Sequence, residues 1–301
     1  CQKEILKKGG HCEISISLPG MAKQYYEYSE ASQLEQPPEL YGHAVRKFDV
    51  IITIQAPFDI FELQDVDEKK LAISQAAIRP IKQKMMKRSS QGDLRWVLCN
   101  YPTKSLAKAA KMTLKKYTEF ITNACFLNKK NPQKAWEDLS NQQEQWVNKL
   151  NQGKKIQFIS EDTNISFKLD QRIWINSDGK RNMPSGEVFT SPIESSAEGM
   201  ITFTIPSLVF GQVINKLVLT LEKGKVVKWE SQTGQALLDR LFSIDGANMV
   251  GEIAIGTNHQ IQDYTLNTLF DEKIGGTIHM AIGASYPETG GKNMSSIHHD
   301  F

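Results

Sequence analysis

The sequence is short of cysteine, and this scarcity limits the classes of protein that it can belong to. Only Cys1, Cys12, Cys99 and Cys125 occur in 301 residues, widely spaced and without a Cys-x-x-Cys pair. This spacing excludes a compact disulfide framework and the thiolate ligands of a structural zinc site. It predicts reduced thiols in a cytoplasmic protein.

Long apolar runs, a secretory signal and a glycine-rich phosphate loop are also missing. These absences predict no membrane-spanning segment and no nucleotide site in the first half of the chain. The net charge is only +2, which argues against nucleic-acid and membrane partners. The basic residues Lys82, Lys84, Lys87 and Arg88 are interpreted as one solvated helix face.

What remains is a composition typical of globular proteins, with 40% hydrophobic and 23% charged residues. The chain begins at Cys1, without Met, within a predicted helix, and it stops at Phe301, directly after a candidate ligand. We therefore expect it to be truncated at both ends.

The first 153 residues alternate between helical and strand patterns. Strands are predicted at 11–17, 48–54 and 94–99, and helices at 38–46 and 67–88. The run at 48–54 is apolar and β-branched, which is typical of a strand covered on both faces. The alternation predicts an α/β domain with a mostly parallel sheet.

The pattern changes twice after that. Helices are predicted at 106–112, 113–126 and 133–150, with Trp136 and Trp146 in the core. After Lys155 the chain consists mainly of alternating strands. The predicted fold is therefore α/β followed by α+β: residues 1–153 form an α/β domain with a helical extension, and residues 154–301 form a strand-rich mixed domain that carries a dinuclear metal site.

Candidate metal ligands lie in this carboxy-terminal part. His279 lies in an apolar run that predicts a buried strand. His298 and Asp300 are two residues apart, so on a strand they share one face, while His299 points the other way. Glu187 and Glu252 are carboxylates that each follow a glycine.

Three carboxylates and two imidazoles suit two divalent ions better than one. A pair of ions commonly shares a carboxylate and acidifies a shared water, which then becomes a nucleophile. Oxygen and nitrogen ligands favour zinc, cobalt or manganese over calcium, with magnesium as a further candidate. Singly these signals are unspecific, because a lone buried histidine is more often a core residue than a ligand.

Several motifs resemble the thermophilic metalloaminopeptidase family, whose members include aminopeptidases T and S. Four of them follow one another in the carboxy-terminal half, at 182–192, 251–258, 267–272 and 279–287. The closing Ile-His-His-Asp-Phe is similar to that family's His-Trp-Asp or His-Val-Asp signature, and Tyr101-Pro-Thr103 also fits. The resemblance covers most of the chain, although the amino-terminal third matches only in pattern.

The resemblance implies a dinuclear metal exopeptidase with a defined ligand set. The implied ligands are Glu187, Glu252, His279, His298 and Asp300, and Glu252 matches the glutamate that bridges both ions. Tyr286 matches a tyrosine at the metal site. His299 replaces an apolar or aromatic residue of the family, which leaves His298 and His299 as alternatives; we keep His298 because it shares a face with Asp300. The family also implies a homodimer and longer ends.

The implied function is metal-dependent removal of the amino-terminal residue from peptides, with Glu187, Glu252 and Tyr286 as catalytic candidates. Glu187 could be a ligand or a general base. Tyr286 could donate a hydrogen bond to the reacting oxygen, or its ring could simply pack beside Pro287.

Two alternatives remain open, a dinuclear hydrolase acting on a phosphate ester and a non-enzymatic small-ligand-binding protein. Asp271 and Glu272 are outside candidates for a proton shuttle. We interpret Asp271-Glu-Lys273 as a charged turn.

Overall fold

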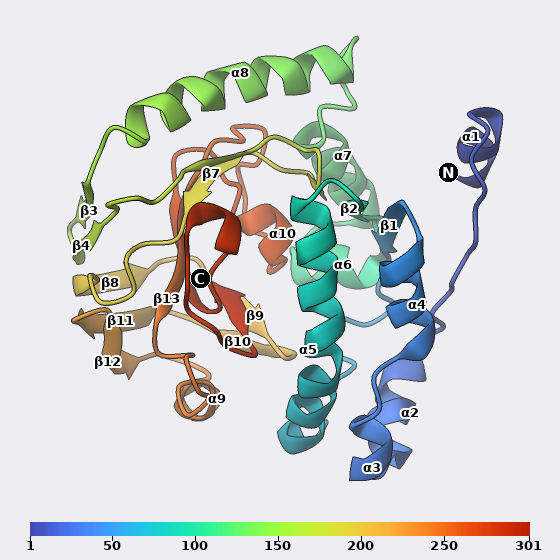
Figure 1. The fold of residues 1–301 in the computed structure, drawn as a ribbon, viewed down its shortest axis with the longest axis horizontal. Coiled ribbons are helices and arrows are strands. Elements are labelled where there is room, and N and C mark those ends of the chain that lie inside the picture. The colour runs from blue at the N-terminus through green and yellow to red at the C-terminus, as the bar shows by residue number, and fades with distance from the viewer.

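A computed structural model describes residues 1–301, apart from the side chain of Glu68. Figure 1 shows the amino-terminal helices on one side, the strand-rich part on the other, and the long helix α8 crossing above it. None of the described helices is both long and apolar enough to cross a membrane.

The amino-terminal part contains a small parallel sheet, as its alternating pattern predicts. Strands β1 (Val50–Gln55) and β2 (Arg95–Asn100) pair in parallel, and β2 also pairs in parallel with β6 (Asn182–Met183). The helices are α1 (Gln2–Lys7), α2 (Met21–Tyr28), α3 (Ala31–Leu34), α4 (Glu39–Lys47) and α5 (Glu68–Ser90). The third strand of this sheet comes from beyond residue 153, where we placed the domain boundary, and that boundary stays a prediction.

One strand predicted in this part does not form, and another forms but is less buried than predicted. Residues 11–17 form no strand, and Ile14 and Ile16 are 61% and 71% exposed, so their alternation with polar residues marks no buried face. Strand β1 does form, but it is not covered on both sides, because Val50, Ile52 and Ile54 are exposed.

The helical middle is confirmed. It consists of α6 (Lys104–Ala109), α7 (Leu114–Ala124) and α8 (Pro132–Leu150). Each helix begins after a residue whose side chain accepts a hydrogen bond from a backbone N–H of the first turn, namely Thr103, Thr113 and Asn131. Trp136 is half-buried and donates to the carbonyl of Cys125. The prediction that Trp146 lies in the core is wrong, because it is 46% exposed.

The carboxy-terminal part contains two five-stranded antiparallel sheets. The first has the order β12-β11-β8-β4-β3, with β3 (Lys155–Ser160), β4 (Thr163–Lys168), β8 (Glu198–Phe203), β11 (Leu217–Glu222) and β12 (Lys225–Glu230). The second has the order β15-β14-β13-β7-β5, with β5 (Ile175–Ser177), β7 (Glu187–Thr190), β13 (Val250–Gly256), β14 (Ile278–Gly283) and β15 (His298–Asp300).

Short elements connect these sheets. They are the β9 (Ser207–Val209) and β10 (Gln212–Ile214) hairpin, the helices α9 (Gln235–Leu241) and α10 (Thr268–Asp271), and the 3-10 helix η1 (Pro287–Thr289). A two-residue loop joins β11 and β12, and its Lys223 and Gly224 both have positive φ, as a type I′ hairpin turn requires.

The two large sheets share one hydrophobic core. The first contributes residues such as Phe167, Ile201 and Leu219, and the second contributes Ile253 and Met280. Helix α8 packs against β5 and β7 at the edge of the second sheet. This packing holds the second sheet in place. The candidate site lies on the face of this sheet that is turned away from the core.

Candidate metal centre

The five candidate ligands lie on adjacent strands of the second sheet. Glu187 begins β7, Glu252 lies in β13, His279 in β14, and His298 and Asp300 in β15. The register places Glu187 opposite Gly256, His279 opposite Ala254, and Asp300 opposite Ala281. Because directly paired residues and residues two apart share a face, all five side chains emerge on the same side of the sheet.

The other side chains on this face leave room for the ligands. Positions between the candidates are occupied by Ala254, Gly256, Ala281 and Gly283. The opposite face carries large apolar residues that belong to the core, among them Val188, Ile253 and Met280. One sheet face therefore stabilises the fold while the other carries the polar groups.

The five side chains converge within contact distance. His279 Nε2 lies 3.3 Å from Glu187 Oε2 and 3.8 Å from Glu252 Oε1. His298 Nε2 lies 3.1 Å from Glu252 Oε2 and 3.6 Å from Asp300 Oδ1. Glu252 thus faces one imidazole with each of its carboxylate oxygens.

These contacts divide the cluster into two groups that could each hold a metal ion. The first is Glu187, Glu252 and His279, and the second is Glu252, His298 and Asp300; in each, the ligand atoms lie within 4.8 Å of one another. Glu252 belongs to both groups, which is the position that a bridging carboxylate would take.

Several buried polar atoms of the cluster lack a hydrogen-bond partner among the described residues. They include Glu187 Oε2, His298 Nε2 and Asp300 Oδ1. A buried polar atom without a partner is costly, and metal coordination would satisfy these three atoms together. The donor set and its unsatisfied atoms therefore fit divalent metal ions.

Burial and charge shift the pKa values of the cluster. Burial alone would raise the pKa of Glu252, but the neighbouring imidazoles of His279 and His298 hold it at about 2. Burial alone would lower the pKa of His279, but Glu252 and Glu187 raise it to about 9. Burial alone would also lower the pKa of His298, but Asp300 and Glu252 raise it to about 10. The carboxylates of the cluster thus stabilise positive charge on the adjacent imidazoles.

The structure distinguishes His298 from His299 by direction. His298 points at Glu252, and its Nδ1 lies 2.7 Å from the carbonyl of Ala284, which orients the ring with Nε2 toward the cluster. His299 points to the opposite face, where its Nε2 lies 3.3 Å from Ser207 Oγ. Burial lowers the pKa of His299 to about 4, so this imidazole is neutral.

Two local features set the position of Glu187. The preceding Gly186 has a φ of +116°, and a Cβ there would come within 2.6 Å of Asn258 Cβ. The fully buried Gln143 of α8 donates to the carbonyl of Glu187 at 2.9 Å and accepts from Thr257 Oγ1 at 2.9 Å. No sequence pattern distinguishes Gln143, because it is one of several glutamines on a polar helix.

Tyr286 lies beside the cluster. Its ring centroid is 4.9 Å from that of His298 and 5.2 Å from that of Phe189. Burial, together with the charges of Glu252 and Asp300, raises its pKa well above the usual value. The phenol is therefore protonated and able to donate a hydrogen bond at neutral pH.

The interpretation of Asp271-Glu-Lys273 as a charged turn is wrong. Lys273 is only 1% exposed, its Nζ lies 2.8 Å from Glu187 Oε1, and it also contacts Glu272 Oε1. Glu272 forms a third group with His279 and Asp300 in which the ligand atoms lie within 4.8 Å. Asp271 accepts hydrogen bonds from the N–H groups of Thr265 and Asn267. Three adjacent charges in a sequence are usually solvated, so the pattern could not reveal this burial.

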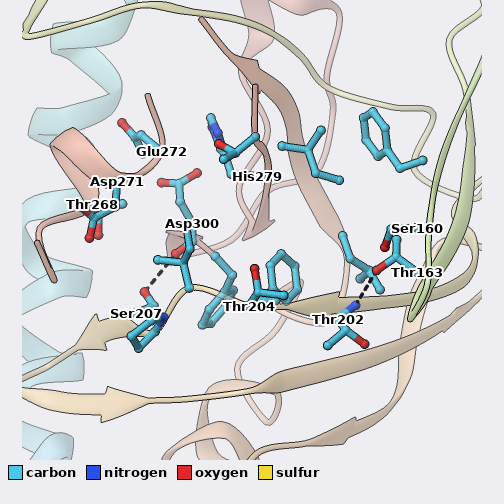
Figure 2. Close-up of a pocket in the computed structure, with 18 of the residues that line it drawn as sticks. Ser160, Thr163, Thr202, Thr204, Ser207, Thr268, Asp271, Glu272, His279 and Asp300 are labelled. Atoms are coloured by element: carbon cyan, nitrogen blue, oxygen red, sulfur yellow. Dashed lines mark hydrogen bonds between the residues drawn. The ribbon is translucent and has the colours of Figure 1, made fainter. Parts of the chain in front are cut away.

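A cavity of about 610 Å³ adjoins one end of the cluster. Figure 2 shows Glu272, His279 and Asp300 gathered at that end, with Thr202 and Thr204 on the opposite wall. Much of the remaining lining is apolar and includes Phe158, Ile205 and Phe301. The cavity is large enough for an amino-acid side chain together with part of a peptide backbone.

Buried carboxylates and imidazoles that converge on one sheet face are typical of metal-dependent enzymes. The family model described as "Thermophilic metalloprotease (M29)" matches residues 1–301, and the chain therefore belongs to this family. Membership implies divalent metal ions, in agreement with the donor set described above.

Relatives of known name agree with this membership. The chain is 30% identical over 218 residues to "Aminopeptidase AmpS" of Bacillus subtilis (strain 168). This alignment covers 66% of this chain and 52% of the relative. It is 26% identical over 275 residues to "Aminopeptidase 2" of Geobacillus stearothermophilus. This second alignment covers 79% of this chain and 66% of the relative. The aligned parts thus span between half and two-thirds of the length of these relatives.

A solved structure shares the fold. The match to "Wild-type AmpT from Thermus thermophilus" has a TM-score of 0.84 at 21% sequence identity and covers 99% of this chain and 82% of that chain. The mixed α/β architecture with one parallel sheet and several antiparallel sheets is confirmed by this likeness.

Proposed function

We propose that this chain is a metal-dependent aminopeptidase that hydrolyses the amino-terminal residue of peptides. The observation that carries the proposal is the convergence of Glu187, Glu252, His279, His298 and Asp300 on one sheet face, with Glu252 common to two ligand groups. The aminopeptidase names of the relatives support the same activity.

In this proposal the first ion is held by Glu187, Glu252 and His279, and the second by Glu252, His298 and Asp300. Divalent ions supply Lewis acidity, which polarises the substrate carbonyl and acidifies water. Zinc, cobalt or manganese suit the mixed oxygen and nitrogen donors, with magnesium as a further candidate.

The remaining groups orient the substrate. Tyr286 donates its phenolic proton in a hydrogen bond to the oxygen on which negative charge develops. Its raised pKa keeps this proton in place. The cavity beside His279 and Asp300 receives the amino-terminal side chain.

Two finer proposals accompany this one. A homodimer is proposed from the family resemblance, and a reducing, cytoplasmic environment is proposed because all four cysteines are free thiols.

The test is hydrolysis of an aminoacyl-anilide before and after treatment with a chelator. We expect chelation to abolish hydrolysis and added cobalt or zinc to restore it, because the metal supplies the Lewis acid. An amino-terminally acetylated substrate serves as a control and should be inert, since its blocked nitrogen carries no free amine. Activity that survives prolonged chelation contradicts the proposal, and preferred cleavage of a phosphate ester indicates a different hydrolase.

A further inference from the structure

Lys273 is a buried cation in direct contact with the proposed metal centre. Its Nζ lies 2.8 Å from Glu187 Oε1, and it also contacts Glu272 Oε1. The side chain is 1% exposed, so water does not screen these contacts. The two carboxylates that contact Nζ pair with it as an ammonium.

The fold places Lys273 over this face of the sheet. The backbone N–H of Asn258, which follows β13, donates to the carbonyl of Lys273 at 3.0 Å. This close approach depends on Gly256, since a Cβ there would come within 2.1 Å of the Ile274 carbonyl oxygen. Gly256 is also the register partner of Glu187, so the lysine segment crosses the sheet directly beside that carboxylate.

The ammonium contacts only one side of the ligand set. It occupies Oε1 of Glu187, while Oε2 of the same carboxylate faces His279. At the other side, Glu252 and Asp300 both face His298. Glu187 therefore shares its negative charge between an ammonium and any metal ion, whereas among the described residues no ion pair joins Lys273 to Glu252, His298 or Asp300.

The charges of the cluster also indicate that the second divalent ion binds more weakly than the first. The proposed ligands Glu187, Glu252 and Asp300 carry three negative charges, one fewer than the four positive charges of two divalent ions. The ammonium of Lys273 adds a fifth positive charge next to Glu187. The last ion to bind therefore enters a cluster that is already nearly neutral, and it does so beside a fixed cation.

We propose that Lys273 makes the two metal sites unequal, so that the Glu252–His298–Asp300 group binds its divalent ion more tightly than the Glu187–Glu252–His279 group. The inference rests on the proposed metal centre. Lys273 is a positioning residue that acts through Glu187 and Glu272, and it sets the metal affinity of the Glu187 group by its charge.

The test counts metal ions in the purified protein and does not depend on activity. The metal-free protein is titrated with Co²⁺, and bound metal is measured after equilibrium dialysis. We expect one ion to be retained at concentrations at least tenfold below those that load the second. The Lys273→Met variant should bind the second ion at least tenfold more tightly than the wild type, because the competing charge is gone.

Two ligand variants identify the tight site without altering Lys273. Asp300→Asn should lose the tightly held ion, whereas Glu187→Gln should keep it. These variants also decide the matter if Lys273→Met does not fold. The opposite pattern, or two ions of equal affinity in the wild type, overturns the inference but leaves the proposed function intact. A wild-type protein that binds no divalent ion refutes the proposed function itself.

Discussion

Replacing Gln143 tests how helix α8 stabilises the strands that carry the site. Its side chain is fully buried in α8 and makes four hydrogen bonds. Nε2 donates to Asn176 Oδ1 at 2.6 Å and to the carbonyls of Ser177 and Glu187, while Oε1 accepts from Thr257 Oγ1. This one residue therefore joins α8, β5, the start of β7 and the segment after β13.

The magnitude follows from the groups that Gln143→Leu would leave without this partner. The Ser177 carbonyl keeps hydrogen bonds from Ser185 Oγ and from the N–H of Gly186. The Asn176 Oδ1 and Thr257 Oγ1 atoms lose their bonds to Gln143, as does the Glu187 carbonyl. At about 1–1.5 kcal/mol for each of these three groups, the free energy of unfolding should fall by about 3–4.5 kcal/mol.

Urea denaturation of the variant measures this loss. Gln145→Leu is the matched control, because Gln145 lies on the exposed face of the same helix and should change stability by less than about 0.5 kcal/mol. Metal affinity should also decrease in Gln143→Leu, since the backbone of Glu187 is less fixed. A difference between the two variants below about 1 kcal/mol would refute the reasoning.

Three further predictions follow from the site. Glu252→Gln should remove bound metal and activity together, because both ligand groups contain Glu252; two retained ions in this variant would disprove its bridging role. In the metal-free protein, the raised pKa of His298, about 10, contributes stability that is complete below about pH 6.5 and is lost as the pH rises toward 10. Urea midpoints of wild type and His298→Asn should therefore converge with rising pH, and a constant gap contradicts this. Leucyl-anilide should exceed glutamyl-anilide in kcat/KM by at least tenfold, because the cavity combines apolar walls with Glu272 and Asp300; a preference for glutamyl-anilide excludes this cavity as the side-chain pocket.

Much of the architecture was predictable because its signals are local. The helices of the middle region have capping residues and helical periodicity, and β13 and β14 are short, strongly apolar strands. The wrong strand at 11–17 alternates just as well, yet Ile14 and Ile16 face no partner strand. Alternation indicates that a segment can form a strand, whereas burial depends on what the rest of the chain places beside it.

The candidate site was predictable only in part. Spacing placed His298 and Asp300 on one face, and resemblance joined them to Glu187, Glu252 and His279 as proposed ligands. Nothing local distinguished Lys273 from a surface lysine, because its burial depends on Gly256, seventeen residues earlier in the chain. Contacts between segments far apart in sequence are set by register and packing, which a single sequence does not display.

Anomalous X-ray diffraction from crystals grown with excess Co²⁺ tests the central claim most directly. The account predicts two anomalous peaks, one among Glu187, Glu252 and His279, and the other among Glu252, His298 and Asp300. Saturated crystals that show metal elsewhere, or no peak within reach of Glu252, would contradict it.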